Sequence, residues 1–293
     1  MNFAFVVLHY QNSSVTEKCI SLLQKLDGID ETYIILVDNA SSNGSGKYLQ
    51  NKYSGYANIV VLLNKKNDGF AKGNNLGYNY ARDVLNANLI VVMNSDVFID
   101  DLLFIGKTKE AFSKSNADII APDIYAMKGF YQNPLREKAL TLQEVRKWYC
   151  KVCCLLVGVS IPYIGDAIAR TLQNIHDEND RRKAMNNHKM REGKIGIVPH
   201  GSCVIFGNKW VQSVPFAFLP YTFMYCEEFL LAYYIESHGY RTEYVPEIKV
   251  VHEAGASRKV DYSKLSTQMR AFYKNEKQSI KQLLYLMKGK IEL

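Results

Sequence analysis

The chain has 293 residues, of which 47% are hydrophobic, so it can bury a full core in one large domain or in one domain with an insertion. This content argues against disorder over most of the chain, and six cysteines without an apolar N-terminal signal segment favour reduced thiols in the cytoplasm over a secreted disulfide framework. The net charge is +7, and all of the positive excess lies after residue 128, which suits either a solvated basic surface or attraction to the phosphates of nucleic acid or of an anionic membrane.

Residues 4–128 alternate short β-branched runs with helical stretches. The runs predict strands at 4–10, 33–39, 58–64, 89–93 and 118–125. Helices are expected to fill most of the gaps between them. This alternation predicts an α/β fold with a mostly parallel central sheet and helices on both faces.

Region 129–195 breaks this rhythm, because clustered basic residues lead into an apolar stretch at 152–165 and then into a charged segment. We interpret it as a helical insertion. The apolar stretch has about 14 residues, too few to span a bilayer, which needs roughly 20. A buried helical hairpin and an in-plane membrane element both remain open, and the flanking Trp148, Tyr149, Lys147 and Lys151 favour the membrane.

The last third of the chain returns to strands and helices. Residues 196–210 predict a strand and a turn, 227–238 a helix closed by Gly239, and 240–251 a strand pair interrupted by Pro246. The tail at 262–287 carries apolar residues at helical spacing with lysines largely elsewhere, which predicts a basic amphipathic helix. Packing on the parent domain and contact with a membrane are both open for this helix.

Polar side chains cluster where predicted strands end. Asn94, Ser95 and Asp96 follow the buried run 89–93, and ligands collect at the carboxyl ends of such strands. Asp96 could therefore hold Mg²⁺ or Mn²⁺, which prefer carboxylate oxygens and commonly bridge to substrate phosphates. Segment 67–75 is rich in glycine and amides, and its backbone N–H groups could approach an anion.

Other candidates are ambiguous when taken singly. Asp38 and Asn39 end the second predicted strand and could bind a base or a ribose, although such a pair often serves turn chemistry alone. Glu227 and Glu228 open a helix, where they could favour the helix dipole or include a general base whose pKa is raised by its neighbour and by burial. His252 follows a strand and could be a metal ligand or a core histidine.

Arg258 and Lys259 could close over a diphosphate, although exposed basic pairs are ordinarily just solvated.

Several other classes of protein are disfavoured. Cys150, Cys153 and Cys154 lack a second Cys or His pair at zinc-ligand spacing. The chain has no Gly-x-Gly-x-x-Gly fingerprint, Walker loop or nucleophile elbow, which argues against a dehydrogenase, a P-loop ATPase and a serine hydrolase. No nucleic-acid recognition motif is present either.

Taken together, the motifs resemble the inverting family 2 glycosyltransferases with the GT-A fold, in particular the rhamnosyltransferase-like branch of bacterial polysaccharide biosynthesis. Segment 37–41 resembles the family's nucleotide-base segment, 67–75 its Gly-Phe-x-x-Gly-Asn-Asn segment, and 94–96 its Asp-x-Asp equivalent. Further on, Gly201 and Ser202 resemble the acceptor-side strand, and the two glutamates stand where the family carries Glu-Asp. The family's following Asp-Leu and Arg are replaced here by Leu230-Leu231 and Tyr233-Tyr234.

The resemblance implies four regions. Residues 1–128 would be the nucleotide-sugar-binding half, 129–195 a helical insertion that could face a membrane, 196–261 the acceptor-binding and catalytic half, and 262–293 a C-terminal amphipathic helix. The implied metal ligands are Asp96 and His252, the acceptor contacts are Gly201 and Ser202, and the catalytic pair is Glu228, as base, with Glu227. The implied nucleotide-sugar contacts are Tyr10, Asp38, Asn39, Asn67, Asp68, Gly69, Phe70, Lys72, Gly73, Asn74, Asn94, Ser95, Arg258 and Lys259.

The implied reaction is a single displacement assisted by Mn²⁺ or Mg²⁺. The donor would be a UDP- or dTDP-sugar, with dTDP-rhamnose the leading candidate, and the acceptor a glycan on a polyprenyl-diphosphate lipid. One sugar per encounter is expected, because the Gln-x-x-Arg-Trp motif of processive synthases is absent. Such an enzyme would be cytoplasmic and peripheral on the inner face of the bacterial membrane. The alternative is a non-catalytic nucleotide-sugar or glycan-binding protein that retains the fold.

Overall fold

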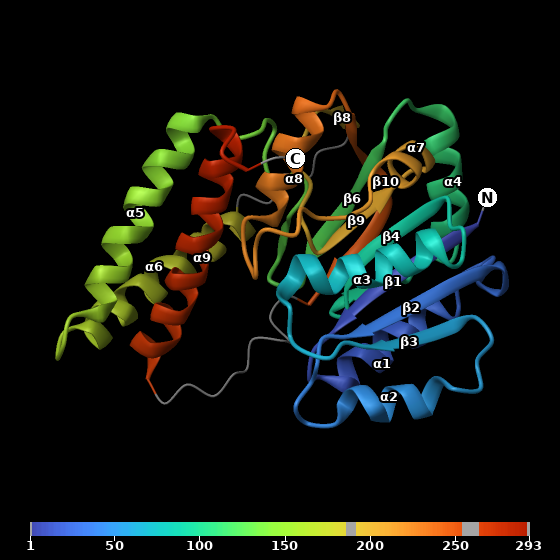
Figure 1. Cartoon of the computed structure of the whole chain (residues 1–293), viewed down its shortest axis with the longest axis horizontal. Coiled ribbons are helices and arrows are strands. Elements are labelled where there is room, and N and C mark those ends of the chain that lie inside the picture. The colour runs from blue at the N-terminus through green and yellow to red at the C-terminus, as the bar shows by residue number, and fades with distance from the viewer. Residues whose placement is uncertain (1, 186–191, 254–263, 292–293) are drawn as a thin grey trace.

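A mixed ten-stranded sheet forms the centre of the part of the chain that the structure describes, residues 2–185, 192–253 and 264–291 of a computed structural model (Figure 1). Eight strands lie side by side in the order β3, β2, β1, β4, β9, β6, β10 and β5, while β7 pairs with β6 and β8 pairs with β10. The bounds are β1 (Phe3–His9), β2 (Thr32–Asp38), β3 (Ile59–Leu63), β4 (Leu89–Asn94), β5 (Val97–Phe98), β6 (Ile119–Ala126), β7 (Phe130–Tyr131), β8 (Lys194–Ile195), β9 (Cys203–Phe206) and β10 (Thr242–His252).

The longer strands of this sheet run in one direction. β3, β2, β1 and β4 pair in parallel, and β6 pairs in parallel with β10. The short β9 is antiparallel to both β4 and β6, so β6 and β10 point the same way as β4. The carboxyl ends of these parallel strands therefore meet at one edge of the sheet, where ligands collect in folds of this kind. The prediction of an α/β fold with a mostly parallel central sheet is confirmed.

Helices cover both faces of the sheet, as predicted. Phe3, Phe5 and Val7 of β1 belong to the core beneath α1, α2 and α4. Ala4 and Val6 belong to the opposite core, which α3, α7 and α8 cover. Successive side chains of a strand point to opposite faces, so a strand buried on both faces is apolar at nearly every position. The bounds are α1 (Ser13–Leu23), α2 (Ser45–Tyr53), α3 (Gly69–Asp83), α4 (Phe104–Lys114), α7 (Asn208–Ser213) and α8 (Glu227–Ser237).

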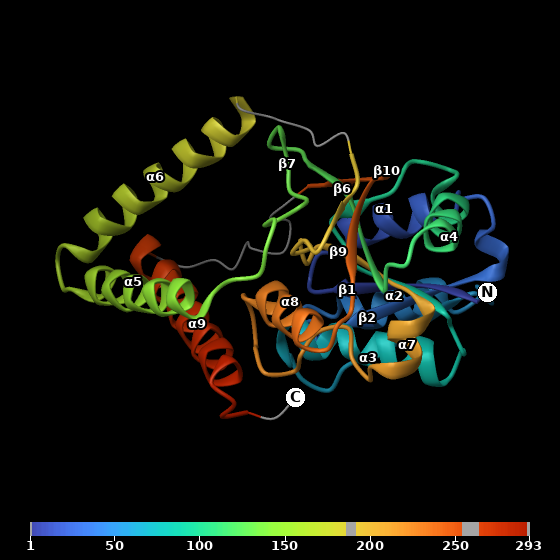
Figure 2. The same cartoon turned by 90° about the horizontal axis from the view of Figure 1, so that it is seen from above.

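The remaining helices form a layer to one side of the sheet: α5 (Leu142–Ser160), α6 (Gly165–Met185) and α9 (Leu265–Met287) (Figures 1 and 2). α5 packs along α9, although more than a hundred residues separate them in the chain. Trp148 Nε1 of α5 donates to Glu276 Oε1 of α9 at 3.2 Å, and Arg270 Nε of α9 donates to the Val159 carbonyl at 3.1 Å. Among the described residues, no helix is long and apolar enough to cross a membrane.

This layer contains the predicted insertion and the predicted tail helix. The apolar stretch at 152–165 forms the second half of α5 and the turn into α6. On α9, Ile280 and Leu283 are buried in the core shared with the sheet domain, so the apolar face of the tail packs on the protein. The two ends of region 129–195 belong to the sheet, because β7 pairs with β6 and β8 pairs with β10.

The last strand differs from its prediction. Residues 240–251 were expected to form a strand pair broken at Pro246, but β10 is a single strand of 11 residues. Its register against β6 shifts between Val245 and Lys249, so the proline lies in a bulge. A bulge removes the ladder hydrogen bond that proline cannot donate, and the strand continues beyond it.

Candidate active site

Asp96 lies in the turn between β4 and β5, at the carboxyl edge of the sheet. Its side chain is buried, and so is that of Ser95. The end of β10 reaches the same place, because His252 pairs with Val97 and the Glu253 N–H donates to the Asp96 carbonyl at 2.9 Å. As a result, His252 Nε2 lies 3.3 Å from Asp96 Oδ1, and the structure brings together the two side chains predicted to bind metal.

The Asp96–His252 pair fits one side of a metal shell. Two donor atoms in adjacent octahedral positions, each about 2.1 Å from an ion, lie about 3.0 Å from each other. The observed separation of 3.3 Å is close to that spacing. The carboxylate suits Mg²⁺ or Mn²⁺, whereas the imidazole is a ligand more typical of transition metals. No cluster of three or more His, Cys, Asp or Glu side chains that could hold an ion occurs in the described residues, so substrate and water would complete the shell.

A second histidine, His200, lies beside this pair, and the sequence analysis did not identify it. Its ring centroid is 5.8 Å from that of His252. Its Nδ1 accepts a hydrogen bond from the Ser202 N–H at 3.2 Å and lies 2.9 Å from Ser202 Oγ. Burial, and then the neighbouring His252, lower the pKa of His200 to about 3. His200 is therefore neutral at physiological pH, and it holds the backbone before β9 in place.

Glu228 meets the same region from α8. Its Oε1 accepts a hydrogen bond from the Gly201 N–H at 3.2 Å, and a Cβ at position 201 would lie only 2.8 Å from that oxygen. The next residue, Ser202, accepts from the Asn94 N–H at 2.9 Å. Asn94 precedes the Asp96 turn, so Glu228 and Asp96 flank the same pair of strand ends, β4 and β9.

The two acidic residues of α8 have different surroundings. Glu227 is 3% exposed, and its Oε1 accepts from Thr222 Oγ1 at 2.9 Å. Burial, and then the charge of Glu228, raise the pKa of Glu227 to about 8. Burial also raises the pKa of Glu228, but this residue is only half-buried. Glu228 is therefore the better placed of the two to meet an acceptor, whereas Glu227 is buried against Thr222.

The turn before α3 uses its polar groups internally. Asn39 Nδ2 donates to Asn67 Oδ1 at 3.0 Å and to the Gly69 carbonyl at 3.1 Å. Asn39 Oδ1 accepts from the Asp68 N–H and from Asn64 Nδ2, at 3.3 and 3.2 Å. The amide of Asn39 is thus committed to the shape of this turn, which fixes α3 to the end of β2.

Three backbone N–H groups of this turn, which its composition predicted for an anion, are bonded within the protein. Those of Asp68 and Gly69 donate to the side chains of Asn39 and Asn67, and that of Phe70 donates to the Phe223 carbonyl at 2.7 Å. Gly69 has a φ of +84°, and a Cβ there would lie 2.1 Å from the same carbonyl. The glycine is needed because that carbonyl approaches the start of the helix so closely.

The other predicted residues of segment 67–75 also pack within the protein. The Phe70 ring lies 5.2 Å from that of Phe218. A Cβ at Gly73 would lie 2.8 Å from Leu8 Cδ1, so this glycine lets α3 approach β1. Asn74 Nδ2 donates to the Phe70 carbonyl at 3.0 Å, while its buried Oδ1 has no hydrogen-bond partner among the described residues.

Asp38 ends β2 and is 5% exposed. Its carboxylate accepts from the Ser41 N–H at 3.3 Å, which is the turn chemistry that the sequence allowed. The buried His9 lies 3.9 Å away through Nε2, which also contacts Ser45 Oγ at 2.8 Å. Tyr10 is half-buried and directly follows β1, so it lies at the same sheet edge as Asp38.

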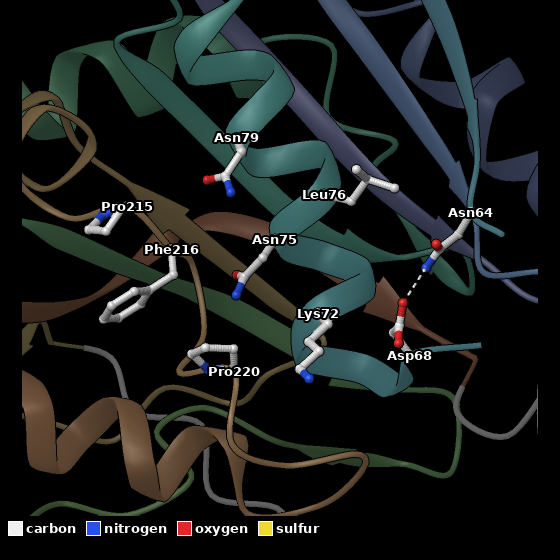
Figure 3. A pocket seen from close by; sticks show the side chains of 9 residues that line it. All are labelled: Asn64, Asp68, Lys72, Asn75, Leu76, Asn79, Pro215, Phe216 and Pro220. Carbon is white, nitrogen blue, oxygen red and sulfur yellow. Dashed lines mark hydrogen bonds between the residues drawn. The ribbon is translucent and has the colours of Figure 1, made fainter. Parts of the chain in front are cut away.

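Lys72 and Asp68 line a separate pocket of about 490 Å³ between α3 and the segment 215–220 (Figure 3). Its other lining residues include Asn75 and Phe216, but neither Asp96 nor Glu228. The structure thus brings Asp96, His252, Gly201, Ser202 and Glu228 together, whereas Lys72 lines a pocket that these residues do not line. Arg258 and Lys259 lie outside the described residues.

Comparison with known proteins bears on the family and the fold of the chain. Residues 4–149, about half of the chain, match the family described as "Glycosyl transferase family 2". No curated protein matches the chain significantly. The match to a crystal structure of S. aureus TarS 1-349 has a TM-score of 0.55 at 11% identity. It covers 100% of this chain and 67% of the TarS chain.

Two other solved structures show the same fold. The mannosyltransferase PcManGT from Pyrobaculum calidifontis, in complex with GDP-Man and Mn²⁺, has a TM-score of 0.54 at 12% identity over 97% of this chain and 69% of its own. GalNAc-T7, with UDP, GalNAc and Mn²⁺, has a TM-score of 0.57 at 11% identity over 86% of this chain and 44% of its own. This chain thus spans from under half to about two thirds of the length of these neighbours. It belongs to glycosyl transferase family 2 and is a glycosyltransferase with the GT-A fold.

Proposed function

We propose that this glycosyltransferase moves one sugar from a UDP- or dTDP-sugar to a glycan hydroxyl with inversion of configuration, and that dTDP-rhamnose is the first donor to test. The observation that carries the proposal is the convergence of Asp96, His252 and Glu228 on the ends of β4 and β9. An inverting displacement needs a held diphosphate and a proton acceptor at one site, and these side chains supply both functions.

Asp96 and His252 would hold Mn²⁺ or Mg²⁺ beside the donor diphosphate. A divalent ion there would stabilise the negative charge that develops on the leaving diphosphate. The neighbours PcManGT and GalNAc-T7 are described with Mn²⁺, which makes manganese the first ion to test. At the far end of the nucleotide, Asp38 would accept the N3–H of uracil or thymine, a group that a carboxylate suits.

Glu228 would take the proton of the acceptor hydroxyl. Its raised pKa makes it a stronger base than an exposed glutamate, and the Gly201 N–H fixes one of its oxygens. The free lone pairs of the carboxylate can then face an acceptor that enters beside Gly201 and Ser202. Glu227, buried and bonded to Thr222, would orient the start of α8.

The acceptor would be linked to a lipid at an anionic membrane surface. The turn between α5 and α6 is the part of the helical layer that supports this proposal, because Ile161, Tyr163 and Ile164 are 40%, 104% and 51% exposed. Arg170 lies near the start of α6, and Lys264 directly precedes α9, whose Ser266 N–H donates to Asp166 Oδ1 of α6 at 3.1 Å. These two basic residues would face anionic headgroups. The apolar face of α9, in contrast, is already covered by the protein.

Two measurements in sequence test the catalytic proposal. The first is a thermal-shift panel of UDP, dTDP, GDP and their sugars with and without Mn²⁺, because a ligand that binds only the folded state raises the melting temperature. The second is turnover of the sugar that binds best, with product stereochemistry read by NMR. Binding of a nucleotide sugar without turnover on any glycan acceptor would favour a sugar-nucleotide-binding role over catalysis, and retention of configuration would exclude the single displacement.

A further inference from the structure

Gln132 contacts His252 on the side of the ring that faces away from Asp96. Gln132 directly follows β7, and its Oε1 lies 2.7 Å from His252 Nδ1. The other ring nitrogen, Nε2, lies 3.3 Å from Asp96 Oδ1. His252 is 6% exposed, so its ring has little freedom to turn.

The chemistry of these atoms determines where the ring carries its hydrogen. In this orientation of the Gln132 amide, its oxygen faces the ring and can only accept, so Nδ1 is the donor. In the neutral imidazole, Nε2 then carries the lone pair and directs it toward Asp96. This is the tautomer that a metal ligand requires, because a metal-bound imidazole commonly donates its other N–H to an oxygen acceptor that fixes the ring.

We propose that Gln132 is a positioning residue, which selects the Nδ1–H tautomer of His252 and so directs Nε2 toward the cation that Asp96 shares. The proposal rests on the metal-assisted function proposed above and adds a residue to it. Gln132 does not contact the donor or the acceptor in this account. It acts only through His252.

The segment around Gln132 is held firmly enough for that task. The Gln132 N–H donates to the Ile124 carbonyl of β6 at 2.9 Å. The next residue, Asn133, is 4% exposed; its Nδ2 donates to the Pro122 carbonyl at 2.7 Å, and its Oδ1 accepts from the His200 N–H at 2.7 Å. Gln132 and Asn133 therefore contact two neighbouring histidines. Gln132 contacts the ring of His252, and Asn133 accepts from the backbone N–H of His200.

Three variants test the proposal. Gln132→Leu keeps the approximate size of the side chain and removes the acceptor, whereas Gln132→Glu keeps an acceptor oxygen. Gln212→Leu, at an exposed position on α7, is the matched control for the same substitution elsewhere. Mn²⁺ affinity in the presence of UDP is measured by electron paramagnetic resonance on each full-length protein, with circular dichroism as the check on folding.

Loss of an outer partner of a metal-bound histidine typically costs about 10- to 100-fold in metal affinity. We therefore expect Gln132→Leu to weaken Mn²⁺ binding at least about tenfold, while Gln132→Glu and Gln212→Leu stay within about threefold of the wild type. Equal affinities for the wild type and Gln132→Leu would overturn the proposal. Equal losses in folded Gln132→Leu and Gln132→Glu would also overturn it, because a mere packing role does not depend on the acceptor oxygen.

A second readout separates this proposal from the proposed function. Long-range ¹H–¹⁵N NMR of the metal-free protein, at a pH where the ring of His252 is neutral, reports which nitrogen carries the hydrogen. We expect the Nδ1–H form in the wild type and a shift to the Nε2–H form in Gln132→Leu, because Asp96 is then the remaining acceptor. The Nε2–H form in the wild type would overturn the proposal. Absence of Mn²⁺ binding in a wild type with the Nδ1–H form would instead contradict the metal-assisted function.

Discussion

The edge of the sheet at β4, β9 and β10 and the turn before α3 are both rich in polar residues, but they use them differently. In the turn, the side-chain amide of Asn39 donates to that of Asn67, and these two amides accept from the N–H groups of Asp68 and Gly69. The following N–H group, of Phe70, donates to the Phe223 carbonyl. At the sheet edge, the Asp96 and His252 side chains face each other at 3.3 Å, a spacing suited to a shared ion. A motif of polar residues therefore locates a site, whereas the hydrogen-bond partners decide which of its atoms can still bind a ligand.

The largest expected effect is on catalysis at Glu228. Glu228→Gln keeps the shape and the Gly201 contact but cannot accept a proton, so we expect kcat to fall about 10³-fold, within the range for a lost general base. Donor affinity should change little, and this is checked by calorimetry with the nucleotide sugar. Glu227→Gln is the matched control, and a larger loss of kcat in that variant would transfer the role of base to Glu227.

The next effect contrasts the two regions directly. Asp96→Asn should weaken Mn²⁺-dependent nucleotide binding by about 10- to 100-fold and leave thermal stability nearly unchanged. Asn39→Ala should leave Mn²⁺-dependent nucleotide binding nearly unchanged and should destabilise the protein. The substitution leaves buried polar groups of the turn without a hydrogen-bond partner, which lowers the free energy of unfolding by about 1–3 kcal/mol. Denaturant melts and Mn²⁺ titrations on both variants check this. If both variants lost Mn²⁺-dependent binding and neither was destabilised, the turn would bind the ligand just as the sheet edge does, and the proposed difference between the two regions would be wrong.

The sequence predicted the fold, and it placed Asp96 and His252 at the ends of strands, because both features depend on local patterns. Apolar runs gave the parallel strands, and acidic or imidazole side chains directly after them gave Asp96 and His252. Gln132 and His200 were missed because their partners lie about 50 to 120 residues away, brought close by the order β9, β6, β10. The order of the strands and the hydrogen-bond partners of individual amides depend on tertiary packing. Local sequence periodicity does not predict either of them. For the same reason, the composition of segment 67–75 suggested an anion cradle but did not show that the N–H groups of Asp68, Gly69 and Phe70 are bonded within the protein.

The third prediction concerns pH and the pair on α8. The pKa of Glu227 is raised from 4.5 to about 8 in the folded protein, so the folded state binds a proton more tightly than the unfolded state does. The stability that this proton confers is complete below about pH 4.5 and is lost as pH rises through about 8. Within that window the loss is at most about 1.4 kcal/mol per pH unit.

Glu227→Gln should therefore gain stability relative to the wild type as pH rises from about 4.5, and the gain should level off above about 8. Urea melts at a series of pH values measure the difference. Glu236→Gln, at an exposed position on the same helix, controls for the change in net charge. A difference between Glu227→Gln and the wild type that does not vary with pH would show that Glu227 is ionised in the fold.

The smallest expected effect concerns the helical layer. Replacing Tyr163 and Ile164 with serine removes apolar surface from the α5–α6 turn and should lower partition onto liposomes with anionic lipid about tenfold. Tenfold corresponds to about 1.4 kcal/mol, a fraction of the roughly 1.5–3 kcal/mol that one large apolar side chain contributes when fully buried, because a surface turn buries these side chains only in part. Serine at Leu102 and Leu103, which are 51% and 56% exposed before α4, is the matched control. Removal of α9 would be a poorer test, because it also uncovers the face of α5 that packs on it. Equal partition of both double variants and the wild type would exclude the turn as the membrane contact.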